Sequence, residues 1–234
     1  MSLVTLDAGH GGYDSGASKG GRLEKNDVLN VVKRVKEILE FNGVSVLLTR
    51  SDDTFVGLSE RCAISNNAGS DLFISIHRNA FDESAHGQET LCYGLSGKGY
   101  ALANAIQTNI IKAGIASANR GVKANPSLAV IHGTHAPAVL TELGFVDNDE
   151  DNELFDDNFE KYCKCVANGI LSTLGVSASS VSEVKANVNI VAKLQAFLND
   201  NGYTDSNGNK LIVDGVYGNC TKSAIAKMLK AVGY

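Results

Sequence analysis

The sequence predicts an α/β fold with a mostly parallel sheet flanked by helices, followed by a small helical C-terminal domain. Apolar runs of strand length alternate with helical stretches over residues 1–175. A short segment of small and polar residues, VSASSVS, then interrupts the pattern, and the rest of the chain is helical and turn-rich. A chain of 234 residues with 44% hydrophobic residues suffices for one sizeable core and a small second domain.

The first part begins with a strand–helix–strand unit. VTLDAGH predicts a strand, residues 24–41 a helix and VSVLLTR a strand. A helix over 58–67 and the strand DLFISIH repeat this order, and a further strand, QETLCYG, precedes a helix over about 97–111. AVLTELGF then predicts a buried strand, and the amphipathic stretch 159–174 is a helix that closes the domain against the sheet.

The second part predicts a small helical bundle. VAKLQAFLNDNGY is helical and ends at Asn-Gly, LIVDGVYGN is rich in turn residues, and TKSAIAKMLKAV is a helix with Thr221 as its N-cap. We therefore expect a folded domain over 1–175, a linker over 176–186 and a second domain over 187–234.

Charge and hydropathy exclude several classes of protein. A formal net charge of -5 argues against a nucleic-acid binder, which needs Lys and Arg to neutralise phosphates, and against membrane-surface attachment. No apolar run approaches the roughly 18 residues that membrane insertion requires. Because the first strand-like run begins at Leu3, we expect no signal peptide.

The cysteines predict neither a metal ribbon nor a disulfide framework. They are odd in number, scattered, and lack C-x-x-C pairs. We expect buried free thiols at all of them: Cys62, Cys92, Cys163, Cys165 and Cys220.

Two histidines and one glutamate form a candidate metal site. His10 and His77 each end a predicted strand, where ligands bind in α/β sheets, and Glu24 opens the first helix. Two neutral imidazoles, one carboxylate and an open position for water form a common catalytic zinc set. A lone strand-end histidine is more often structural, and the glycines around His10 lack the spacing and the lysine of a phosphate-binding loop.

Six ordered sequence blocks now point to a family. They resemble the zinc-dependent N-acetylmuramoyl-L-alanine amidases, and they are DAGHGGYDSGA, LEKNDVLN, LLTRSDD, LSERCAISN, SIHRNA and PAVLTELGFVDN. The resemblance implies that His10, Glu24 and His77 ligate zinc, that Glu142 is catalytic, and that the partner is bacterial peptidoglycan.

The chemistry of amide hydrolysis fits these roles. Zinc lowers the pKa of its bound water to about 7 and polarises the scissile carbonyl. A carboxylate beside the metal, but not bound to it, is still needed to move a proton from the water to the leaving amine. Glu142, at the end of a buried strand, is the candidate, and a strand-end glutamate without chemistry is the alternative.

The remaining histidines have simpler explanations. His86 lies in a polar loop and is expected to be solvated. His132 and His135 are three residues apart, which on a helix could hold a metal, but the Gly and Pro of VIHGTHAP argue against a helix. A contact of either one with substrate is the lesser alternative.

Four further polar residues lie in or near these blocks, and the roles of two of them, Asn79 and Asp7, remain open. Asn79 is a candidate for substrate binding, with a turn-forming role equally compatible with its position. Asp7 is either a partner of the ligand His10 or a strand-end hydrogen bonder. Arg50 and Arg61 are expected to pair with carboxylates, and we do not place them in the site.

The tail resembles the small helical peptidoglycan-binding modules through LQAFLNDNGY and VDGVYGNCTKSAI. If so, Asp214 and Tyr217 are candidates for contact with glycan or stem peptide, whereas Leu194 is expected in the core. This resemblance is less specific than that of the first domain, because a DG-x-x-G turn before a Thr-capped helix occurs in helical bundles of many kinds.

Together these observations predict a modular lytic enzyme, with an amidase domain over 1–175 and a cell-wall-binding domain over 187–234. The expected absence of a signal peptide favours a phage endolysin, made in the host cytoplasm and acting on the wall after release. The alternatives are a host autolysin with the same chemistry, a wall-binding protein with an inactive catalytic domain, and another zinc hydrolase of wall peptides.

Overall fold

The computed structural model describes residues 2–177, 181–216 and 218–231. The chain divides into two compact units, Met1–Ala178 and Ser179–Tyr234, and each is described by itself. Across the described residues no helix combines the length and the apolar character that crossing a membrane requires.

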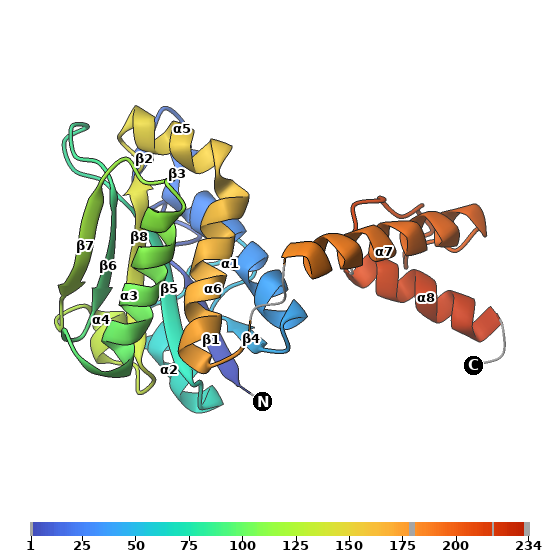
Figure 1. Cartoon of the computed structure of the whole chain (residues 1–234), viewed down its shortest axis with the longest axis horizontal. Coiled ribbons are helices and arrows are strands. Elements are labelled where there is room, and N and C mark those ends of the chain that lie inside the picture. The colour runs from blue at the N-terminus through green and yellow to red at the C-terminus, as the bar shows by residue number, and fades with distance from the viewer. Residues whose placement is uncertain (1, 178–180, 217, 232–234) are drawn as a thin grey trace. The chain divides into compact units, whose positions relative to one another are not determined.

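A six-stranded sheet forms the centre of the first unit (Figure 1). Its order is β4 (Ser45–Leu48), β1 (Leu3–Ala8), β5 (Leu72–Asn79), β8 (Ala138–Phe145), β6 (Gln88–Cys92) and β7 (Asn119–Ala124). The first four strands run parallel, β6 is antiparallel to β8, and β7 is parallel to β6. The mostly parallel sheet expected from the sequence is confirmed.

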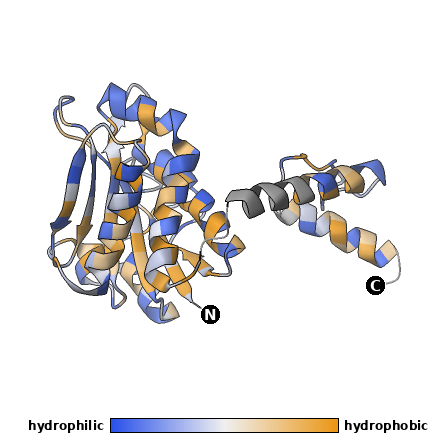
Figure 2. Ribbon diagram, in the orientation of Figure 1, coloured by the Kyte–Doolittle hydropathy of each residue, from blue (hydrophilic) through white to orange (hydrophobic). Residues whose placement is uncertain are grey.

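Helices cover both faces of this sheet. The larger core lies under α1 (Glu24–Phe41), α3 (Gly97–Lys112) and α6 (Phe159–Leu174), and the smaller lies under α2 (Leu58–Ala68) and α4 (Ala129–His132). The apolar residues of α1 recur at helical spacing and are buried, because one stripe of the helix packs on the strands. Figure 2 accordingly shows hydrophobic and hydrophilic residues alternating along the covering helices.

Several elements of the first unit do not follow from the sequence pattern. Strand β7 is polar and exposed at both ends, so it lacks the apolar alternation of a strand. Helix α5 (Asp149–Asp157) is mostly acidic and depends on capping by Asn148, whose side chain accepts from the Asp151 N–H. A short hairpin, β2 (Ser18–Lys19) and β3 (Arg22–Leu23), precedes α1.

The cysteine prediction is partly wrong. All five thiols are free, and four are buried, but Cys220 is exposed. It lies at the start of α8, where the apolar face of the helix is supplied by other residues, so nothing forces its side chain inward.

The second unit is a small helical unit built on α7 (Val181–Asp200) and α8 (Asn219–Ala231). Its core contains Leu198, Leu211 and Ala224, and Leu194 packs against it, as the sequence predicts. Helix α7 begins inside the segment 176–186 for which the sequence predicts a linker, because SEVKAN is compatible with helix even though it lacks apolar periodicity.

Candidate metal centre

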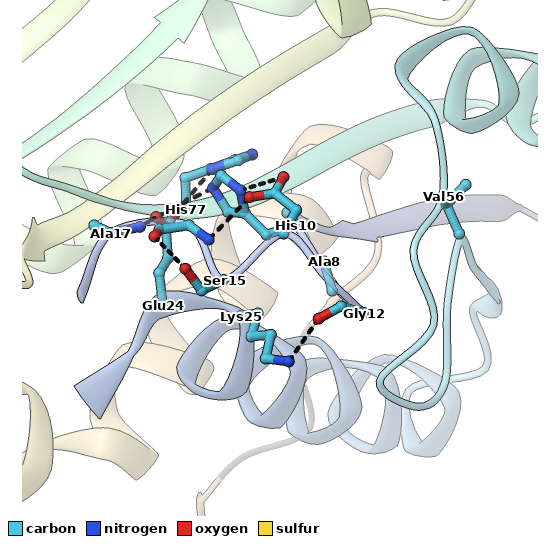
Figure 3. Close-up of polar contacts among 12 residues, drawn as sticks. Ala8, His10, Gly12, Ser15, Ala17, Glu24, Lys25, Val56 and His77 are labelled. Atoms are coloured by element: carbon cyan, nitrogen blue, oxygen red, sulfur yellow. Dashed lines mark hydrogen bonds and ion pairs between the residues drawn. The ribbon is translucent and has the colours of Figure 1, made fainter. Parts of the chain in front are cut away.

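Three side chains from separate elements converge at the carboxyl edge of the sheet (Figure 3). His10 follows β1, His77 lies near the end of β5, and Glu24 is the first residue of α1. One donor atom from each lies within 4.8 Å of the others, close enough to hold a single metal ion. The His10 Nε2 lies 3.1 Å from Glu24 Oε2, and the His77 Nδ1 lies 2.9 Å from Glu24 Oε1. The sequence-predicted triad is therefore assembled in space.

The loop that carries His10 has an unusual backbone. His10 has a φ of 59°, in the left-handed region that non-glycine residues rarely adopt. A Cβ added to Gly9 would lie 2.3 Å from Cε1 of His77, and one added to Gly16 would lie 2.6 Å from Glu24 Oε2. Only glycine allows the chain to pass so close to the side chains of His77 and Glu24, which explains part of the glycine-rich block.

Glu24 is the electrostatic centre of the site. It is 3% exposed, and it also accepts hydrogen bonds from the backbone N–H groups of Ala17 and Arg78 at 2.9 and 2.8 Å. Burial alone would raise the pKa of Glu24, but hydrogen bonds from His10 and His77 hold it well below its usual range. Burial likewise opposes protonation of His77, yet the bond to Glu24 raises the pKa of that imidazole to about 9. Glu24 is thus ionised and favours positive charge at the site, whether on a proton or on a metal ion.

The partner of His10 is a residue that the sequence analysis did not select. Asp14 Oδ2 lies 2.9 Å from His10 Nδ1, which leaves Nε2 directed toward Glu24. A carboxylate on the second ring nitrogen fixes the orientation of a ligating imidazole. The four-residue separation within the glycine-rich block was the available signal, but a loop without regular periodicity gives no means of judging which atoms meet.

Asp7 forms hydrogen bonds at the end of its strand and is not a partner of His10. Its carboxylate accepts from Thr49 Oγ1, Ser75 Oγ and Arg61 Nη1 at 2.7, 2.6 and 2.7 Å, and no hydrogen bond to His10 is present. It is fully buried and belongs to the support beneath the site. Arg61 pairs with it, as expected of an arginine next to a carboxylate.

Two arginines bind the backbone beneath His10. Arg61 donates to the carbonyls of Ala8 and His10, and Arg50 donates to those of Ala8 and Gly9. Both arginines are nearly inaccessible to solvent. These four hydrogen bonds from two planar guanidinium groups therefore satisfy carbonyls that an irregular loop leaves unpaired.

Glu142 stands next to the triad on the adjoining strand. In the sheet register it pairs with His77 of β5 on one side and Glu89 of β6 on the other. Its Oε2 is buried and has no hydrogen-bond partner among the described residues. Burial raises the pKa of Glu142 to about 7, while the charge of His77 acts in the opposite direction. A carboxyl that titrates near neutrality can both accept and return a proton.

The other candidate residues are not part of the triad. Asn79 closes a turn with the Ala80 N–H and donates to Glu89 at 3.2 Å. The His86 imidazole contacts Ser117. His132, the last residue of the short α4, lies face to face with Tyr93 at 6.3 Å between ring centroids, and His135 is exposed. The prediction that this segment is not helical is wrong over Ala129–His132, since one turn forms before the glycine.

In the second unit, Asp214 has a local structural contact. Its carboxylate accepts from Gln195 Nε2 at 2.7 Å and from the Val216 N–H at 2.9 Å, which closes the turn between the two helices. Tyr217 lies outside the described residues.

The fold and the site define an α/β protein with a His/Glu/His group able to hold a metal ion at the carboxyl edge of its sheet. The model of the N-acetylmuramoyl-L-alanine amidase family matches residues 4–172, and the chain belongs to this family. The match lies within the first unit.

Individual proteins with similar sequences include a phage endolysin and a probable cell wall amidase. The chain is 45% identical over 160 residues to an endolysin of Bacillus phage SPP1, covering 65% of this chain and 58% of that protein. It is 37% identical over 161 residues to a probable cell wall amidase LytH of Staphylococcus epidermidis, covering 68% of this chain and 53% of that protein. The chain thus spans between half and three fifths of the length of these two relatives.

Solved structures share the fold. The catalytic domain of CwlV, an N-acetylmuramoyl-L-alanine amidase from Bacillus (Paenibacillus) polymyxa, superposes with a TM-score of 0.70 at 35% identity, covering 76% of this chain and all of that one. The amidase AmiC2 of Nostoc punctiforme gives 0.69 at 37% identity, covering 74% and 97%.

Proposed function

We propose that this chain hydrolyses the amide bond between N-acetylmuramic acid and L-alanine in bacterial peptidoglycan, with zinc held by His10, Glu24 and His77. The observation that carries the proposal is the convergence of these three donors beside the buried carboxyl of Glu142, in a chain of the amidase family. The donor set suits zinc, which binds imidazole nitrogen and carboxylate oxygen and keeps one position open in catalytic sites.

The residues present fit the ion in charge as well as in number. Metal ligands must be deprotonated, so an ion replaces the proton that Glu24 otherwise stabilises on His77. The Asp14 carboxylate then supports the neutral His10 ring through its second nitrogen. Zinc, when bound, lowers the pKa of a water molecule and polarises a carbonyl oxygen.

Glu142 moves the proton in this proposal. Its carboxylate takes one proton from the attacking water as the oxygen–carbon bond forms, and it returns that proton to the nitrogen of L-alanine as the carbon–nitrogen bond breaks. The unpartnered Oε2 and the pKa of about 7 support this role, because the group is free to bind a proton and titrates near neutrality. The products are a free lactyl carboxylate and a new amino terminus on the stem peptide.

Metal content and activity test the ligand set together. We expect one zinc per chain in the wild type and loss of both zinc and hydrolysis in His77→Ala, since two remaining donors hold zinc weakly. His86→Ala is the matched control, because His86 contacts Ser117 and should keep its zinc and its activity. Elemental analysis that finds stoichiometric zinc in His77→Ala would show that other residues hold the ion.

We further propose that the second unit binds cell wall and that the whole chain acts as a bacteriolytic endolysin. The similarity to the endolysin of phage SPP1 and the division into two compact units support this modular arrangement. Asp214 and Tyr217 stay the candidates for wall contact, and Asn79 stays the candidate for substrate contact in the first unit. A host autolysin with the same chemistry is the alternative.

The modular proposal predicts separable activities. Residues 1–178 alone should hydrolyse soluble muropeptides as fast as the full chain, but should digest insoluble wall about tenfold or more slowly at low enzyme concentration, because tethering raises the local concentration. Residues 179–234 alone should sediment with wall and cut nothing. If the full chain sediments with wall and the isolated second unit does not, the binding role belongs elsewhere.

A further inference from the structure

An acidic residue next to Glu142 holds two cations that the proposed reaction does not use. Glu89 of β6 is 7% exposed and lies in register with Glu142, so both side chains leave the same face of the sheet on neighbouring strands. Its carboxylate accepts from Arg120 Nε at 3.1 Å, from Lys123 Nζ and from Asn79 Nδ2. Arg120 and Lys123 both belong to β7, the last strand beyond β6 in Figure 1.

The charges in this cluster do not cancel. One carboxylate faces two cations, which leaves one surplus positive charge beside the proposed active site. The cations are also accessible, since the side chain of Arg120 is 34% exposed and that of Lys123 is 47% exposed. An anion approaching the site therefore meets these two side chains before it meets the buried Glu89.

Arg120 is held with its terminal nitrogens available. Its guanidinium lies 5.0 Å above the ring centroid of Phe145, at the carboxyl end of β8, which fixes the plane of the group. Among the described residues its Nε makes the only hydrogen bond, to Glu89, so Nη1 and Nη2 remain free to donate. A planar guanidinium with free donors matches the geometry of a carboxylate.

The distance from the reacting bond suits a peptide. The Arg120 Nε lies 3.1 Å from a carboxylate oxygen of Glu89, and β6, which carries Glu89, lies about 4.8 Å from β8, which carries Glu142. An extended peptide advances about 3.3–3.6 Å per residue, so a substrate group about two residues from the scissile amide can reach the Arg120 guanidinium. The stem peptide of peptidoglycan carries a carboxylate in that range, on the glutamyl residue that follows L-alanine.

We propose that Arg120, assisted by Lys123, binds the free α-carboxylate of the second residue of the stem peptide and so makes the enzyme selective for walls in which that carboxylate is not amidated. This inference rests on the proposed amidase function and adds the feature of the substrate that the site selects. Glu89 acts as a positioning residue, because it orients both cations without touching the substrate.

The test compares two synthetic muropeptides that differ only in this group, one with D-glutamate and one with D-isoglutamine at the second position. For the wild type, KM should be about tenfold higher with the amidated peptide, since a charge-assisted hydrogen bond is lost. For Arg120→Gln, KM should be equally high with both peptides, while kcat changes little. Arg120→Lys keeps the positive charge but lacks the planar guanidinium donors, so it should retain part of the preference for the peptide with D-glutamate.

Arg34→Gln is the matched control. Arg34 has a similar exposed fraction, 30%, and also pairs with carboxylates, but on α1 and with Glu160 and Glu37. It should keep the wild-type preference. Equal KM values for the two peptides in the wild type, or a preference that survives Arg120→Gln, would overturn the proposal. A fall in kcat that is the same for both peptides would mean that Arg120 acts on Glu142 through Glu89, which also overturns it.

Failure of the underlying function gives a different result. If the wild type cleaves neither muropeptide, the amidase proposal fails, and calorimetric binding of the same two peptides then decides the carboxylate proposal. Tighter binding of the free carboxylate that is lost in Arg120→Gln supports it, and equal binding of the two peptides refutes it.

Discussion

Replacing Glu142 by glutamine is expected to lower turnover by a factor of about 100 or more, the usual scale of general acid–base catalysis. Glutamine keeps the size of the side chain and can still form hydrogen bonds, but it cannot accept the proton of the attacking water. The fold should survive, because Glu142 Oε2 makes no hydrogen bond within the described residues. Zinc content should also be unchanged, since Glu142 is not one of the three proposed ligands.

The variant needs zinc analysis and circular dichroism beside the rate measurement. Glu60→Gln, a change of the same kind on the exposed side of α2, is the control and should leave turnover unaltered. Near-normal turnover of Glu142→Gln with zinc bound would mean that another group moves the proton, and Glu89, the next carboxylate along the sheet register, would be the first to examine.

Replacing Arg61 by methionine should cost about 3–5 kcal/mol of folding stability, the usual result of removing one partner from a buried ion pair. Arg61 and Asp7 have side chains that are 3% and 1% exposed, so the remaining carboxylate cannot be solvated. The carbonyls of His10 and Val56 also lose their arginine donor, and the carbonyl of Ala8 keeps only the donor from Arg50. Urea unfolding of the full chain, followed by circular dichroism, measures the loss as a lower midpoint.

Arg34→Met provides the comparison for this stability effect. Arg34 pairs with carboxylates whose side chains are about half exposed, so its removal should cost no more than about 1 kcal/mol. In the double variant Asp7→Asn/Arg61→Met much of the loss should be recovered, because no unpaired charge remains buried. A loss in Arg61→Met no larger than in Arg34→Met would show that the buried pair does not support the loop of His10.

The sequence was sufficient to predict the sheet, its main helices and the three side chains that converge at its carboxyl edge, His10, Glu24 and His77. Strands such as LFISIH and AVLTELGF are apolar enough to predict burial. The amphipathic pattern of residues 159–174 also predicts the bounds of helix α6. These candidate ligands could be selected because each stands at an element end: His10 after β1, Glu24 at the start of α1 and His77 near the end of β5.

What the sequence could not provide depends on contacts between distant segments. The pairing of Arg61 with Asp7 joins residues far apart in the chain, and the cluster of Glu89, Arg120 and Lys123 exists only because β7 adds to the edge of the sheet beside β6. Strand β7 is itself polar, so its place in the sheet is fixed by pairing with β6 and not by its own pattern. No periodicity in a single sequence reports such contacts.

Product analysis on purified cell wall tests the central claim most directly. The full chain should release peptides with new L-alanine amino termini and leave the glycan strands intact, as identified by mass spectrometry. A chelator should abolish this release and added zinc should restore it. New reducing sugar ends, cleavage within the stem peptides instead of at L-alanine, or release that continues unchanged in the presence of chelator would contradict the assignment of a zinc-dependent amidase.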